Sequence, residues 1–115
     1  MVKFKEIFAF KNKEIKQSFK SSKLLNKVFG LKLLKAPLYD NTKEFGKLLT
    51  VGSRKSGKAH ERNLIRRRIK AIFYEEKLFE NQNIFIILVY KEAKRFSFDQ
   101  IKSFLVSSIK PKQPK

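Results

Sequence analysis

The sequence predicts an α+β fold, a two-layer sandwich in which three helices pack on a small mixed sheet in the order αβββαβα. Apolar residues recur at helical spacing in three segments, and short apolar runs of strand length lie between them. The length of 115 residues supports one domain with a modest core. We therefore expect a single domain over residues 1–110 and a disordered basic tail over residues 111–115.

The first predicted helix begins at Lys11, and Asn12 is its expected N-cap. Ile15 and Phe19 lie four residues apart and therefore share one side of this helix. Residues 1–10 show no clear period. We expect their phenylalanines only to pack over the sheet: Phe4, Phe8 and Phe10.

A hairpin of two strands is expected next. Residues 21–26 have the composition of a connection, and residues 28–34 alternate imperfectly between apolar and polar, as a strand does. Pro37 ends this strand. The turn-forming residues 39–44 then lead into a return strand over residues 45–52.

The longest helix is expected to begin at Ser56 or Gly57 and to reach about Leu78. Residues 80–83 break this helix. The apolar run over residues 84–90 then predicts a strand that is buried on both faces.

The last helix is expected to begin after Ser97, because Ser97 and Gln100 fit a capping box. In a capping box, each of the two side chains accepts a hydrogen bond from the backbone N–H of the other residue. The apolar residues that follow share one face of a helix. These residues are Phe98, Ile101, Leu105 and Ile109.

Charge is the strongest feature of the composition. Lys and Arg total 28 against 10 acidic residues, which gives a formal net charge of +18 and a pI near 10.3. Self-repulsion of this size destabilises a compact monomer, so we expect a polyanionic partner. Nucleic acid is favoured over an anionic membrane surface, because membrane-surface binding is typical of one long basic amphipathic helix and here the charge is spread along the chain.

We expect a cytoplasmic protein that does not enter membranes. The apolar run 84–90 is far too short to cross a bilayer, and charges interrupt residues 1–16 too often for a signal peptide. The absence of Cys fits a reducing compartment.

Residues 52–58, GSRKSGK, fit the phosphate-loop pattern G-x-x-x-x-G-K. In nucleotide-binding loops the next residue is Ser or Thr, whose hydroxyl holds magnesium, but here it is Ala59. The several parallel strands of such folds are also missing from the predicted elements, so ATP or GTP binding is not expected. The N-terminus of the following helix still attracts phosphate oxygens. Three cations precede or begin it: Arg54, Lys55 and Lys58.

The long helix separates into two faces when its residues are placed at 100° intervals. One face is apolar and is expected to pack on the sheet: Ile65, Ile69, Ile72 and Phe73. The opposite face is polar and mostly cationic: Asn63, Arg66, Arg67 and Lys70. Arg62 lies in the first turns and Arg68 flanks this face, so the arginines are placed for bidentate capture of phosphates.

A solvated helix face is the ordinary alternative for such a set of charges. Exposed helices usually pair Glu with Lys at i, i+4, yet residues 62–70 contain no carboxylate. Acidic residues return only after this segment, at Glu75 and Glu76. We therefore favour binding of a polyanion.

Residues 49–73, LTVGSRKSGKAHERNLIRRRIKAIF, resemble the signature of the bacterial ribonuclease P protein subunit family, whose usual core reads R-N-R-x-K-R-x-x-R. Arg62, Asn63 and Arg67 match this core. Arg66 stands in for Lys and Lys70 for the final Arg. Leu64 replaces an Arg, and the adjacent Arg68 is in a position to compensate.

The resemblance extends over roughly residues 10–109. Residues 11–22 are similar to the family's first helix, with Phe19 kept as the second aromatic and Ile15 in place of the first. Residues 29–34 resemble the strand that follows, with Lys32 where the family often has Tyr. The resemblance implies an α+β sandwich with a left-handed βαβ crossover.

The resemblance also implies two binding surfaces. The arginine helix and its loop would bind a large catalytic RNA through Arg54, Lys55, Lys58, Arg62, Asn63, Arg66, Arg67, Arg68 and Lys70. A cleft between the first helix and the sheet would hold the single-stranded 5′ leader of precursor tRNA. The residues implied for the leader are Lys11, Asn12, Ile15, Phe19 and Lys32.

The holoenzyme of this family hydrolyses one phosphodiester to release the leader, with magnesium held mainly by the RNA and no protein partner required. The residues agree with a protein that supplies no catalytic group or metal site: His60 has no evident partner, and Asp40 and Asp99 are isolated. Two other functions stay open: a structural RNA-binding module, such as a small ribosomal protein, and an independent nuclease. Phe19 can either stack on leader bases or belong to the core.

Overall fold

The computed structural model describes residues 4–38, 45–52 and 59–109, except for the side chains of Ala59, His60 and Arg62. It confirms the α+β class. The helices in this part of the chain are α1 (Phe4–Phe8), α2 (Asn12–Ser21), α3 (Ala59–Glu75) and α4 (Phe98–Ile109). The strands are β1 (Lys23–Val28), β2 (Leu31–Pro37), β3 (Lys47–Gly52) and β4 (Asn83–Val89). Two 3₁₀ helices flank β4, η1 (Leu78–Glu80) and η2 (Lys91–Arg95).

The four strands form one mixed sheet in the order β1-β2-β4-β3. β4 lies between an antiparallel neighbour, β2, and a parallel neighbour, β3. Because β3 and β4 are parallel, the chain between them must cross over, and it does so through α3. The left hand of this crossover stays a prediction from the resemblance.

The predicted hairpin between residues 28–34 and 45–52 is wrong, because β4 separates β2 from β3. The hairpin instead joins β1 to β2. Residues 23–26, which were expected to be part of a connection, belong to β1, and the expected strand over residues 28–34 is interrupted by the turn between β1 and β2. Gly30 has a φ of +106° in the turn between them, a conformation that other residues rarely adopt.

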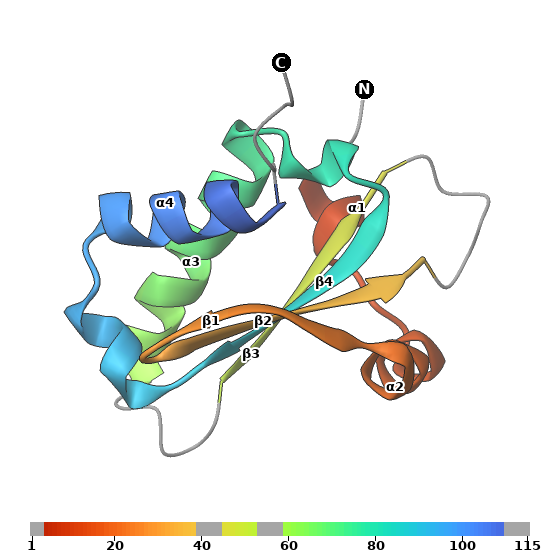
Figure 1. Cartoon of the computed structure of the whole chain (residues 1–115), viewed down its shortest axis with the longest axis horizontal. Coiled ribbons are helices and arrows are strands. Elements are labelled where there is room, and N and C mark those ends of the chain that lie inside the picture. The colour runs from red at the N-terminus through yellow and green to blue at the C-terminus, as the bar shows by residue number, and fades with distance from the viewer. Residues whose placement is uncertain (1–3, 39–44, 53–58, 110–115) are drawn as a thin grey trace.

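Helices lie on both sides of the sheet (Figure 1). The first side is covered by α3 and α4, with α1 packed beside them, and holds the main core. Phe73 of α3 contacts Phe85 of β4 edge-on, with ring centroids 6.1 Å apart. Phe8 of α1 contacts Phe73 at the same centroid distance. Of the described helices, α2 lies on the second side, which also holds a smaller cluster around Ile84 and Ile86.

The N-terminal helix α1 was not predicted, so the described residues contain four α-helices instead of three. Phe4 and Phe8 do pack, with ring centroids 4.7 Å apart, and Phe4 also meets Tyr74 of α3. The N-cap of α2 is Lys11 and not Asn12, since Asn12 already has helical backbone geometry.

The other element ends are close to those predicted. α3 ends at Glu75 instead of Leu78, because Lys77 adopts a left-handed conformation with a φ of +53°. The capping box of α4 is confirmed: the Ser97 N–H donates to Gln100 Oε1 over 2.8 Å, and the Gln100 N–H donates to Ser97 Oγ over 3.2 Å. Phe98 does not join the buried face of α4, since the first turn leaves it 38% exposed.

Candidate nucleic-acid interface

The inner face of α3 is buried as predicted. Ile69 and Phe73 have no exposed surface, and Ile65 and Ile72 retain at most 4%. Burial of one such side chain contributes about 2 kcal/mol, and the four together hold the helix in one rotational setting. The opposite face of α3 is therefore fixed toward solvent.

The polar residues of α3 lie together on one face of the helix, as the sequence predicts. Asn63, Arg66, Arg67 and Lys70 together line a surface hollow of about 500 Å³. Asn63 and Arg67 are exposed, whereas Arg66 and Lys70 are half-buried. A concave surface that carries two guanidinium groups, an ammonium group and an amide is suited to phosphate oxygens.

Packing holds two of these cations in place. The Nζ atom of Lys70 lies 5.5 Å from the centre of the Phe8 ring, a cation–π contact between α3 and the unpredicted helix α1. The Nε atom of Arg66 is shielded from solvent and has no hydrogen-bond partner within the described part of the chain. Arg66 and Lys70 are thus partly immobilised, which lowers the entropy that either side chain loses on binding a ligand.

Several residues predicted for this surface lie outside the described part of the chain: Arg54, Lys55 and Lys58, together with the side chain of Arg62. Leu64, which replaces an Arg of the family core, is 40% exposed. Arg68 is half-buried and does not line the hollow. The structure brings together four of the residues predicted for catalytic-RNA binding.

Within the described residues, no helix covers the half of the second sheet face that lies away from α2, and we call it the open half. Lateral neighbours in a sheet point to the same side, so the register places one cross-strand row on this face. We call it the lysine row: Lys27, Lys32, Leu88 and Val51. Of these residues Lys27 is exposed and the other three are half-buried, and the next row, toward α2, includes half-buried Leu34 and Leu49. The open half is thus an apolar strip with two lysines at its end.

The covered half of this face is held by an ion pair. Lys47 Nζ of β3 lies 2.9 Å from both carboxylate oxygens of Glu14 of α2. The two residues are 6% and 8% exposed. Lys47 Nζ also lies 4.3 Å from the centre of the Phe10 ring. No pattern in the sequence had marked Glu14 or Lys47, because each is one charge among many in a basic chain.

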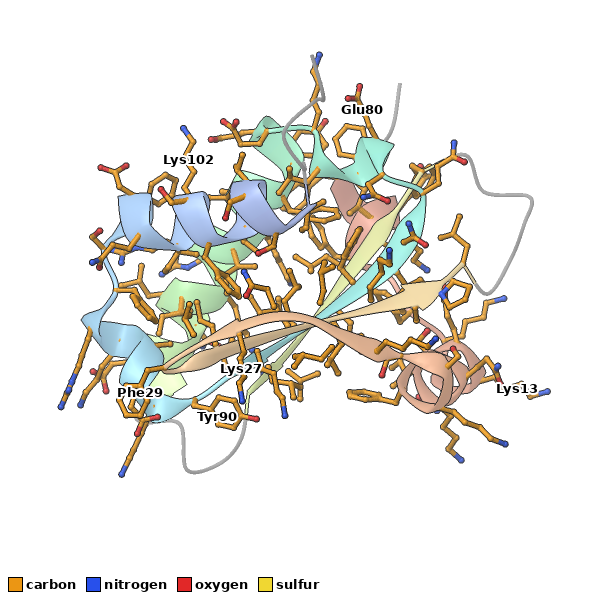
Figure 2. All side chains as sticks on the ribbon, in the orientation of Figure 1. Lys13, Lys27, Phe29, Glu80, Tyr90 and Lys102 are labelled. Atoms are coloured by element: carbon orange, nitrogen blue, oxygen red, sulfur yellow. The ribbon has the colours of Figure 1, made fainter. Side chains whose placement is uncertain are left out.

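The leader-binding residues predicted on α2 occupy its solvent side and its flank. Lys11 and Asn12 are exposed, and Ile15 is half-buried. Phe19 is 39% exposed and belongs to neither of the two core clusters. Figure 2 shows the cations of α2, such as Lys13, directed outward from the helix.

Two further features bear on function. Among the described residues, no group of three or more His, Cys, Asp or Glu side chains is arranged to hold a metal ion. Within the same residues, no helix has the length and apolar composition needed to cross a membrane.

Together, the crossover fold and the basic face of α3 define a small α+β protein with a concave cationic surface on one helix. The sequence profile of the family described as Ribonuclease P matches residues 3–112. The chain belongs to this family, whose proteins take part in tRNA 5′-end processing as the protein component of an endoribonuclease.

The sequences of two relatives support this assignment to the family. The chain is 39% identical over 98 residues to the ribonuclease P protein component of onion yellows phytoplasma, a match that covers 84% of this chain and 67% of that protein. It is 46% identical over 56 residues to that of Helicobacter hepaticus, covering 49% of this chain and 38% of the relative.

The fold is that of solved ribonuclease P proteins. The protein from Staphylococcus aureus superposes with a TM-score of 0.74 at 21% identity, covering 90% of this chain and 93% of that one. The protein from Thermotoga maritima gives a TM-score of 0.74 at 20% identity, with coverages of 93% and 98%. At these identities the superpositions establish the fold alone.

Proposed function

We propose that this chain is the RNA-binding protein subunit of ribonuclease P and assists removal of the 5′ leader from precursor tRNA. The observation that carries the proposal is the hollow on α3 lined by Asn63, Arg66, Arg67 and Lys70. These residues fall within the stretch that resembles the family signature, and the buried isoleucines beneath them fix their orientation.

The hollow would receive backbone phosphates of the catalytic RNA. Each guanidinium group can bind a phosphate bidentately, and the local absence of carboxylates on residues 62–70 leaves these groups available. The chemistry itself would belong to the RNA, which would hold the catalytic magnesium. The protein would contribute affinity and orientation, in the cytoplasm, without a protein partner.

The 5′ leader would lie across the open half of the second sheet face, beside α2. This strip offers half-buried apolar residues for bases and Lys32 for the backbone, and exposed Phe19 adds an aromatic ring from α2. Single-stranded RNA is commonly bound in this way, by aromatic stacking within a basic surface.

Reconstitution with a bacterial catalytic RNA tests the proposal. We expect the protein to stimulate precursor-tRNA cleavage at low magnesium concentration, because its cations replace part of the ionic screening that the RNA otherwise needs. Binding of RNA without stimulation would favour a structural RNA-binding protein instead. Cleavage by RNA-free protein would indicate an independent nuclease.

A double variant tests the α3 surface within this assay. Arg66→Ala with Arg67→Ala should weaken catalytic-RNA binding at least tenfold and reduce the slope of log affinity against log salt by about 2. The charge-matched control is Lys77→Asn with Lys102→Gln, which removes two cations elsewhere; Asn tolerates the left-handed backbone at position 77. Equal losses in both variants would show that only net charge matters.

A further inference from the structure

A second hollow lies at the tip of the β1–β2 hairpin and shares only Lys27 and Lys32 with the surfaces described so far. Its volume is about 570 Å³, within the range of roughly 300–1,000 Å³ typical of small-ligand sites. Phe29 and Tyr90 provide its aromatic walls, and Lys27 and Lys32 line the same hollow. Figure 2 shows Phe29, Tyr90 and Lys27 in the half of the molecule away from α2.

The aromatic rings of this hollow are unusually accessible. Phe29 is 73% exposed and Tyr90 is 39% exposed, although the core elsewhere buries Phe73 and Phe85 completely. Exposed aromatic side chains beside cations are the common arrangement of single-stranded nucleic-acid sites, because every base has a face that can stack.

The backbone that presents Phe29 is held rigidly. Gly30 adopts its φ of +106° while closely packed against η2, where an added Cβ would meet the Ala93 nitrogen at 2.8 Å. The Tyr90 N–H donates a 2.9 Å hydrogen bond to the Gly30 carbonyl oxygen, which joins the turn to the end of β4. The backbone at the tip of the hairpin is therefore fixed before any ligand binds, which lowers the entropy cost of binding.

The charges around the hollow favour a polyanion. Lys27 and Lys32 are direct cross-strand partners, and like charges in such positions destabilise a sheet. A phosphate between them would relieve this repulsion. Glu92 also lines the hollow, where its carboxylate disfavours a free phosphate but can accept a hydrogen bond from a base amino group.

We propose that this hollow, the hairpin-tip site, binds one unpaired nucleotide of a single-stranded RNA, with its base stacked on Phe29 or Tyr90 and its phosphate beside Lys27 and Lys32. The proposal extends the proposed function and rests on it. The lysine row continues from the open sheet face into the hairpin-tip site, so one RNA strand can occupy both.

The chain contains no Trp, so Phe29→Trp places a single fluorescent reporter in the site. We expect a short single-stranded RNA to quench this Trp by stacking, whereas inorganic polyphosphate, which has charge but no bases, leaves it unquenched. The matched control is Ser103→Trp, at an exposed position of α4 on the opposite side of the sheet, and RNA should not quench it. Equal quenching by polyphosphate, or none by RNA, would overturn the proposal.

A second variant keeps the test independent of the reporter. Phe29→Leu combined with Tyr90→Leu retains apolar side chains but removes both aromatic faces, and should weaken single-stranded RNA binding by about tenfold. Unchanged affinity, in a variant with the circular dichroism spectrum of the wild type, would refute the site.

Reconstituted cleavage separates this proposal from the proposed function. If the wild type stimulates cleavage but the RNA fails to quench Phe29→Trp, only the hairpin-tip site is wrong. If the wild type neither binds RNA nor stimulates cleavage, the proposed function fails as well.

Discussion

The two faces of the sheet are built from neighbouring residues of the same strands but differ in how they are covered. On the first face, α3 and α4 bury Leu33, Phe85 and Ile87, so that less than 1% of the surface of each residue is exposed. On the second face, Lys32 and Leu88, each next in sequence to one of these residues, stay half-buried. One face therefore supplies most of the stability, and the other retains surface for a ligand.

The helices that meet the two faces differ in the same way. α3 contacts the first face through isoleucines and Phe73, whereas α2 directs Glu14 and Ser18 toward the second. Ser18 satisfies its hydroxyl locally, by donating to the Glu14 carbonyl oxygen over 2.7 Å, and the Glu14 carboxylate requires Lys47. An apolar contact fixes α3, and a directional polar contact fixes α2.

The largest expected effect is on the first face. Phe73→Ala should lower the free energy of unfolding by about 3–5 kcal/mol, because it leaves a cavity where α1, α3 and β4 meet. The paired variant on the second face, Leu88→Ala, should cost about 1 kcal/mol, since its side chain is only half-buried. Urea denaturation measures both, and equal losses would contradict the distinction between the faces.

A smaller but still large effect is expected at the ion pair. Lys47→Met should lower the free energy of unfolding by about 3 kcal/mol, because it leaves the buried Glu14 carboxylate without its partner. Adding Glu14→Gln to Lys47→Met should recover part of this loss, and a double-mutant cycle in urea measures the coupling. The partly exposed pair Lys102–Glu76, with Nζ and Oε2 3.4 Å apart, is the control and should contribute under about 0.5 kcal/mol.

The smallest effect on stability is expected at Phe19. Phe19→Ala should change the free energy of unfolding by under about 0.5 kcal/mol, since the ring is already 39% exposed. It should weaken binding of precursor tRNA with a long leader by about tenfold relative to mature tRNA, because one stacked base is lost. Fluorescence anisotropy with both RNAs measures the difference. Equal affinity losses for the two RNAs would show that Phe19 does not contact the leader.

Segments with strong local signals were predicted closely from the sequence. The separation of Ile65 from Arg67 on opposite faces of α3 follows from helical periodicity alone, and the Ser97–Gln100 box from short-range hydrogen bonding. Both depend only on residues within a few positions of each other.

The errors in the predicted fold arose where long-range tertiary contacts, and not the local sequence, determine the structure. β1 is largely exposed and irregular, with a register shift between Leu24 and Asn26, so residues 23–28 lack the alternation that marks a strand. The position of β4 between β2 and β3 is a long-range choice that no local pattern records. α1 did carry a short signal, since Phe4, Ile7 and Phe8 fall at helical spacing, but one turn and a half was too little to recognise.

The functional surfaces also differ in whether the sequence could predict them. The basic face of α3 was found because four of its members share one helix. The hairpin-tip site was not, because Phe29 and Tyr90 come from distant segments that only the sheet register brings together. The Glu14–Lys47 pair was missed for the same reason.

The crossover through α3 has a consequence for assembly. β3 and β4 reach each other only after the intervening segment has folded back over the sheet, and such non-local pairing forms slowly. A ribozyme that binds the folded helix but not the unfolded chain stabilises the folded state. It would raise the free energy of unfolding by about 2.7 kcal/mol when its concentration is a hundredfold above Kd. The ribonucleoprotein particle would then be more resistant to heat and proteolysis than its free polypeptide, and its maturation would be coupled to closure of this one crossover.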